Sequence, residues 1–209
     1  MYFKELSETL KSIDKIKLQN LKDNIKNCSG TIYIIGNGGS SSIASHACND
    51  ILKSFKKKAF NLTDNVATFS AFSNDISYED ALKEILKDIL KSDDLLICLS
   101  TSGKSKNILK AFEYSKDICK SVLITGNKTE ISDFVIDSSD TQILEDCFGA
   151  IFHCICRLWI CCIFEPLGSN FYPLVLYKVL NSWVSNVSKF RNFLVLIYKI
   201  KHFKLNFKV

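Results

Sequence analysis

Apolar residues in the first 26 positions recur mostly three or four places apart, and polar residues stand between them. They are Leu6, Leu10, Ile13, Ile16, Leu18, Leu21 and Ile25. This spacing puts them on one face of an α-helix, and the segment contains no glycine or proline that would interrupt a helix. The pattern predicts one long amphipathic helix over residues 2–26.

Beyond this helix, short continuous apolar runs alternate with segments of helical spacing. The runs that predict strands cover residues 31–35, 59–62, 94–100, 121–125 and 134–136. Helices are predicted over residues 40–55, 80–91, 104–115 and 140–164. Buried strands that alternate with helices are typical of a parallel sheet with helices on both faces. The sequence therefore predicts an α/β fold, a doubly wound parallel sheet whose ligands would bind at the carboxyl ends of the strands.

The chain changes character after Gly168. Residues 170–209 hold seven basic and no acidic residues, and they are rich in Phe, Tyr, Leu and Val without a helical period. The first 169 residues carry 20 basic and 22 acidic side chains, so the net charge of +5 comes from the tail. We expect one domain over residues 1–165 and an atypical basic, aromatic tail over residues 166–209. The tail could attach to a membrane surface or a partner, whereas the mildly acidic domain argues against nucleic-acid binding.

The nine cysteines do not predict disulfides. Their number is odd, five lie in the predicted helix 140–164, and no pair of CxxC motifs occurs, so we expect reduced thiols. The amino-terminal residues contain no apolar signal core, so we expect a cytoplasmic protein. The apolar run 147–164 includes His153 and Arg157, which would be costly in lipid, and no transmembrane span is expected.

The segment Ser100–Ser105 is the strongest chemical signal in the sequence. It places four hydroxyl side chains and Gly103 directly after a predicted strand and before a predicted helix. Hydroxyls and free backbone N–H groups at a helix start suit a phosphate, and glycine lets the backbone approach it. These residues could instead serve only as turn and helix-capping residues, but four of them around one glycine favour an anion site. The loop is not a Walker motif, and the glycines of residues 36–39 lack the spacing of a dinucleotide fingerprint.

Two pairs of an acid and a histidine lie on predicted helices. His46 and Asp50 are four residues apart and Glu145 and His153 are eight apart, so each pair shares a helix face. Each pair alone could be ordinary: a surface histidine beside a solvated acid, or a helix-start acid with a buried histidine. If the two helices meet, the four side chains could hold a divalent metal such as zinc or supply a base and an acid for proton transfer.

Together these motifs resemble a known family. The residues that carry the resemblance are Gly36-Asn37-Gly38-Gly39-Ser40, His46, Asn74-Asp75, Ser100-Thr101-Ser102-Gly103-Lys104-Ser105-Lys106-Asn107 and Thr125-Gly126. Over roughly residues 1–160 they resemble the sugar isomerase (SIS) domain and, more narrowly, the phosphoheptose isomerases, also called sedoheptulose 7-phosphate isomerases. The resemblance implies a five-stranded, three-layer sandwich and a homotetramer with active sites between subunits. It also implies conversion of sedoheptulose 7-phosphate to D-glycero-D-manno-heptose 7-phosphate, which supplies heptose for lipopolysaccharide or capsule.

The family pattern also implies roles for single residues. By matching position, the substrate would contact Asn37, Gly38, Gly39, Asp50, Asn74, Asp75 and Glu145. Its phosphate would be held by Ser100, Thr101, Ser102 and Ser105. One zinc ion would be held by His46, Asp50, Glu145 and His153, with Asp50 as the general base and His153 as the general acid. Such an isomerisation moves a proton between adjacent carbons through an enediol, which needs a base, an acid and an anchor for the phosphate.

Two residues depart from the family pattern. The family has Glu where Asp50 stands and Gln where Glu145 stands. Asp50 is one methylene shorter, and a misplacement of about 1 Å can cost roughly a hundredfold in rate, while Glu145 adds a negative charge. The alternative to an enzyme is therefore a non-catalytic SIS protein that binds a sugar phosphate and regulates a partner.

Overall fold

The computed structural model describes residues 1–126 and 131–163, with the side chains of its last helix described as far as Arg157. Residues Met1–Cys161 form one compact unit. The predicted tail, residues 166–209, lies outside the described residues. None of the helices that the structure describes is long and apolar enough to span a membrane.

The amino-terminal segment forms two helices, so the prediction of one long helix was wrong. α1 covers Tyr2–Ser12 and α2 covers Lys15–Asn27. Between them Ile13 leaves the helical conformation, and the Asp14 carboxylate accepts hydrogen bonds of 2.8 and 3.1 Å from two backbone N–H groups of the new first turn. An aspartate at this N-cap position stabilises the start of a helix. The apolar stripe continues across the break, and periodicity alone therefore does not reveal it.

Five parallel strands form the central sheet, as predicted. They are β1 (Ile32–Ile35), β2 (Ala59–Asn61), β3 (Leu95–Ser100), β4 (Lys120–Thr125) and β5 (Phe134–Val135). Their order across the sheet is β2-β1-β3-β4-β5, and every neighbouring pair is parallel. Parallel neighbours need crossover connections, which carry the helices to the two faces of the sheet.

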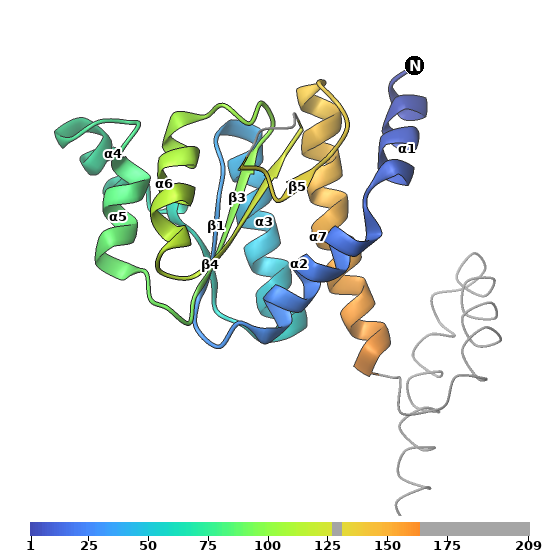
Figure 1. Ribbon diagram of the computed structural model, residues 1–209, viewed down its shortest axis with the longest axis horizontal. Coiled ribbons are helices and arrows are strands. Elements are labelled where there is room, and N and C mark those ends of the chain that lie inside the picture. Colours follow the sequence, from blue (N-terminus) through green and yellow to red (C-terminus); the bar gives the residue numbers. More distant parts are fainter. Residues whose placement is uncertain (127–130, 164–209) are drawn as a thin grey trace, which may run out of the picture. The chain divides into compact units, whose positions relative to one another are not determined.

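Alternate side chains of each central strand enter two separate cores. Four of the helices that cover the sheet are α3 (Gly38–Phe55), α5 (Ala81–Ile89), α6 (Lys106–Lys116) and α7 (Thr141–Ile163). Ile32 and Ile34 of β1 pack with residues of α2, α3 and α7, whereas Tyr33 and Ile35 pack with residues of α5 and α6. Figure 1 shows the two groups of helices on opposite sides of the sheet, which makes the fold doubly wound.

One helix was not predicted from the sequence. α4 covers Val66–Asp75 and follows a short 3-10 turn at Leu62–Asp64. Asn65 begins it by accepting a hydrogen bond from the backbone N–H of Thr68 (3.2 Å). None of its side chains is fully buried, and Phe69 is only partly buried against the core on the α5 and α6 side of the sheet.

The seven cysteines that the structure describes are free thiols, and six of them are buried. Burial raises the pKa of Cys48 to about 12 and the pKa of Cys147 to about 11. Because the thiolate is the reactive form of cysteine, these buried thiols are chemically inert parts of the core at neutral pH.

The carboxyl ends of β1, β3 and β4 meet at one edge of the sheet. A glycine loop (residues 36–39) follows β1, a serine loop (residues 100–105) follows β3, and Gly126 follows β4. The Gly126 N–H donates to the carbonyl of Thr101 (3.1 Å), and an added Cβ at Gly126 would collide with the Leu144 side chain near the start of α7. In Figure 1, α3, α6 and α7 all begin at this edge, so the predicted motifs lie where a parallel sheet binds ligands.

Candidate active site

The serine loop makes a tight turn between β3 and α6. Gly103 has a φ of 64°, a left-handed conformation that glycine adopts without strain, and its N–H donates to the carbonyl of Ser100 (3.1 Å). The N–H of Lys104 donates to the hydroxyl of Ser102 (3.2 Å). This turn directs the first turn of α6 back toward the end of β3.

The side chain before α6 does not cap the helix. Ser105 occupies the N-cap position without accepting a hydrogen bond from α6, and its hydroxyl instead accepts one from the buried Ser100 hydroxyl (3.2 Å). Thr101 is half-buried and Ser102 is exposed beside them. N–H groups at a helix start bind anions through hydrogen bonds and through the helix dipole. The loop therefore has the donors that a phosphate needs.

The glycine loop brings the start of α3 close to α7. Gly38 has a φ of 53°, which favours glycine. Gly39 lies so close to the Glu145 carboxylate that an added Cβ would collide with it. Glu145 thus places its negative charge at the start of α3, where the helix dipole stabilises it.

Asn37 links the glycine loop to α6. Its side chain does not cap α3. Instead its Nδ2 donates to Oδ1 of Asn107 (2.9 Å), and its Oδ1 accepts from Nδ2 of Asn107 (2.8 Å) and from the hydroxyl of Tyr78 (3.0 Å). Neither Asn107 nor Tyr78 was predicted as a site residue. Asn107 closes the serine-rich motif and could have been noticed there, whereas no sequence pattern marks Tyr78.

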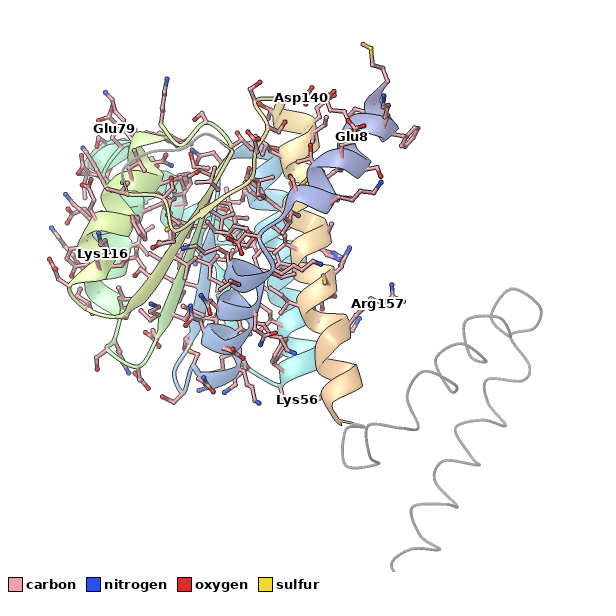
Figure 2. The ribbon with its side chains drawn as sticks, turned by 45° about the vertical axis from the view of Figure 1, so that its right-hand side comes forward. Glu8, Lys56, Glu79, Lys116, Asp140 and Arg157 are labelled. Carbon is pink, nitrogen blue, oxygen red and sulfur yellow. The ribbon has the colours of Figure 1, made fainter. Side chains whose placement is uncertain are left out.

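His46, Asp50 and His153 come together where α3 and α7 lie side by side. Figure 2 places Asp140, before α7, at the upper end of the fold and Lys56, after α3, at the lower end, so both helices run in the same direction. Nε2 of His46 lies 2.9 Å from Nε2 of His153, and Oδ2 of Asp50 lies 3.3 and 3.5 Å from these two nitrogens. The sequence predicted the shared helix faces, and the structure shows that the two helices meet there.

This cluster fits a zinc ion. Its two imidazoles and one carboxylate offer ligand atoms that all lie within 4.8 Å of one another. A tetrahedral site with bonds of about 2.0–2.1 Å separates its ligand atoms by roughly 3.3 Å, close to the distances from Asp50. Glu145, the fourth predicted ligand, is not in this group, because it lies about two turns nearer the start of α7. Cys156 also stays outside it, and burial raises the pKa of this thiol.

The cluster is open to solvent on one side. The side chains of His46 and His153 are 57% and 55% exposed, whereas that of Asp50 is 20% exposed. A ligand can therefore reach both imidazoles from outside, while the carboxylate between them is partly shielded.

Asn74 and Asp75 lie on a different helix layer from the histidine cluster. They end α4, which belongs to the opposite helix layer from α3 and α7 (Figure 1). Both are exposed, and Nδ2 of Asn74 donates to Oδ1 of Asp75 (3.0 Å). Within residues 1–126 and 131–157, no hydrogen bond joins them to the serine loop or to the histidine cluster. Their contact with a substrate stays a prediction.

Comparison with known proteins agrees with these features. Residues 1–123 match the family model of the SIS domain. The phosphoheptose isomerase of Thermodesulfovibrio yellowstonii is 31% identical over 176 residues, which cover 78% of this chain and 85% of that protein. The phosphoheptose isomerase of Helicobacter pylori (strain P12) is 30% identical over 165 residues, which cover 73% and 85%.

Solved structures share the fold. A phosphoheptose isomerase from Neisseria gonorrhoeae has a TM-score of 0.67 at 20% identity, over 76% of this chain and 94% of that one. Another from Francisella tularensis has a TM-score of 0.66 at 23% identity, with the same coverage. The chain therefore belongs to the SIS-domain family and, within it, to the phosphoheptose isomerases, which are sugar-phosphate isomerases.

Proposed function

We propose that this enzyme converts sedoheptulose 7-phosphate to D-glycero-D-manno-heptose 7-phosphate. One observation carries the proposal. Two features lie along one side of the fold and are linked through Asn37, Gly39 and Glu145. One is a hydroxyl-rich loop that ends in an uncapped helix start, and the other is a carboxylate beside two imidazoles. The first feature suits the phosphate of a sugar and the second suits proton transfer at its other end.

The serine loop anchors the substrate. The phosphate binds Ser100, Thr101, Ser102 and Ser105 together with N–H groups at the start of α6. An anchored phosphate limits the positions of the reacting carbons, so that they stay close to the catalytic side chains in a reactive orientation. Asn37, Gly38, Gly39, Asn74 and Asp75 are the proposed contacts with the rest of the sugar.

Asp50 and His153 move the protons. Asp50 takes a proton from the carbon next to the carbonyl group, and His153 donates one to the sugar oxygen, so that an enediol forms. Oδ2 of Asp50 lies 3.5 Å from Nε2 of His153, a separation that lets the two groups serve adjacent carbons of one substrate. Asp50 then returns its proton to the neighbouring carbon while His153 takes the proton from the other enediol oxygen, which forms the new carbonyl group and restores both residues.

The proposed zinc site comprises His46, Asp50 and His153, with Glu145 as the fourth candidate ligand. When bound, zinc would act as a Lewis acid that polarises the sugar oxygens. The donor atoms of His46, Asp50 and His153 form the only such group among the described side chains.

The wider setting follows from the family. We propose a cytoplasmic homotetramer with active sites between subunits, whose product supplies heptose for surface polysaccharide. The exposed imidazoles support an interfacial site, because a second subunit could complete the open side of the cluster. We propose residues 1–165 as the catalytic domain and residues 166–209 as a separate tail.

An isomerase assay on the zinc-loaded full chain tests the proposal, with the aldose and ketose forms followed by NMR. We expect turnover by the wild type and a loss of at least about a hundredfold in kcat for Asp50→Asn, because this variant removes the base while keeping its shape. Asp50→Glu is the control that keeps a carboxylate. Wild-type protein that binds the sugar phosphate without turning it over would contradict the proposal.

A non-catalytic regulator that binds a sugar phosphate is the second candidate. Asp50 and Glu145 favour it, because both depart from the family pattern. The double variant Asp50→Glu/Glu145→Gln restores that pattern. A large gain in turnover over the wild type would indicate a degraded catalytic site, whereas equal turnover would favour an active one.

A further inference from the structure

Three segments at the carboxyl edge of the sheet are joined through Asn37. Its Oδ1 accepts hydrogen bonds from both Asn107 and Tyr78, and its Nδ2 donates to Oδ1 of Asn107. The carbonyl oxygen of an amide has two lone pairs, so both are occupied. One N–H bond of Asn37 is left for any further ligand.

Asn107 is the buried half of this pair. It is 2% exposed and is the second residue of α6, directly after the serine loop. Its amide exchanges two hydrogen bonds with Asn37, at 2.9 and 2.8 Å. A buried amide is costly to leave without partners. The pair therefore holds the start of α3 at a set distance from the start of α6.

Tyr78 connects a third segment to the same point. Its side chain is half exposed, and its hydroxyl donates to Asn37. The next residue, Glu79, forms ion pairs with Lys106 (2.8 Å) and Lys110 (3.5 Å) of α6. Figure 2 shows Glu79 at the same end of the fold as Asp140. Residues 74–80, which begin with the proposed sugar contacts, are therefore attached to the first turns of α6.

We propose that Asn107 and Tyr78 are positioning residues, which act through Asn37 to hold the serine loop, the glycine loop and residues 74–80 in one arrangement. Their effect on catalysis rests on the proposed function: the arrangement sets the distance between a bound phosphate and the proton-transfer residues on α3 and α7. An error of about 1 Å in such a distance costs roughly a hundredfold in rate. Asn37 is then mainly a strut between two loops and only secondarily a contact of the substrate.

A double-mutant cycle tests this role. We expect Asn37→Ala, Asn107→Ala and the double variant to lower kcat by a similar factor, roughly ten- to a hundredfold, because the two amides act as one unit. The dissociation constant of inorganic phosphate, measured by calorimetry, should stay at the wild-type value. Effects that multiply in the double variant would overturn the proposal, since Asn37 would then act on the substrate independently of Asn107.

Hydrogen exchange gives a readout that needs no turnover. Asn107→Ala should speed amide exchange in residues 36–41 and 100–106, and Tyr78→Phe should speed it in residues 74–80 only. The matched control is Ser115→Ala, which removes a buried hydroxyl at the far end of α6 and should change neither these segments nor kcat. Wild-type exchange in Asn107→Ala would overturn the proposal even if the isomerase assay succeeds, and faster exchange would support it even if that assay fails. If Asn107→Ala does not fold, Asn107→Asp takes its place, because it keeps the size and loses the donor to Asn37.

Discussion

Asp50 is one methylene shorter than the glutamate that the family resemblance implies, and its carboxylate still reaches both imidazoles of the cluster. Asp50 lies one turn after His46 on α3, and its Oδ2 is 3.3 Å from His46 Nε2 and 3.5 Å from His153 Nε2. The shorter side chain therefore reduces how far the proposed base extends toward a substrate, while the cluster of three side chains is kept.

Two neighbouring glycines of the carboxyl edge should respond differently to a methyl group. An added Cβ at Gly36 meets backbone atoms of Ser40, whereas at Gly39 it meets the end of the flexible Glu145 side chain, which can rotate away. We expect Gly36→Ala to lose about 1–3 kcal/mol of unfolding free energy and Gly39→Ala to lose clearly less. Urea denaturation of both variants measures this, and equal losses would contradict the expected difference.

The sequence predicted which site residues share a helix face, but it did not predict which of these faces meet in the folded protein. The spacing of His46 and Asp50 correctly indicated one helix face. That this face meets His153 depends on how α3 and α7 pack on the sheet, which no local pattern contains. Tyr78 illustrates the same limit, because its contact with Asn37 spans 41 residues of sequence and leaves no trace in hydrophobic spacing.

At the scale of elements, strands were the most predictable part of the fold. Each of the five apolar runs became a strand, and the signal has the clearest cause in β1 and β3, which are buried along their whole length. The errors have local causes. Asp14 caps a new helix inside an unbroken apolar stripe, and α4 buries no side chain. Hydrophobic periodicity therefore failed to predict a helix boundary set by a capping residue and a helix with no buried side chain.

The contact between α5 and α6 should depend on pH through Asp80. Hydrogen bonds from Lys110, Lys83 and Ser77 hold the pKa of this carboxyl well below its usual range. Because the folded pKa is below the unfolded value of about 3.9, this contribution to stability is complete above about pH 5 and is lost as the pH falls. We expect Asp80→Asn to lower the melting temperature at pH 7, and the difference from wild type to shrink toward pH 3.

The matched control for this prediction is Asp88→Asn, which removes an exposed carboxylate from the same helix. Its melting temperature should follow that of the wild type more closely at pH 7. A deficit of Asp80→Asn that stays constant from pH 7 to pH 3 would show that the lysine contacts do not cause it.

At the scale of the whole molecule, the order of contacts explains how distant segments could serve one substrate. The serine loop contacts Gly126 of the next strand end, Asn107 reaches Asn37, and Gly39 touches Glu145 on α7. Two turns further along α3 and α7 lie the histidines. The two helices run parallel and both begin at the edge where the loops meet. The loops and the histidines therefore lie along the same side of the fold.

Zinc should stabilise the folded chain through this cluster. A metal that binds only the native state raises the melting temperature with its concentration. We expect the zinc-dependent rise to be lost in His46→Ala and in His153→Ala, and to be reversed by a chelator in the wild type. Cys156→Ala is the control, since that thiol lies beside the cluster outside its ligand group. An undiminished zinc effect in His153→Ala would contradict the assigned site.

The labelling rates of the buried thiols can be used to measure local opening of the protein. A cysteine-specific reagent can reach Cys48 or Cys98 only while the surrounding layers are separated, because the native interior denies it both access and the thiolate form. Cys48 lies in one core and Cys98 in the other. The ratio of their labelling rates therefore shows which face of the sheet opens more often.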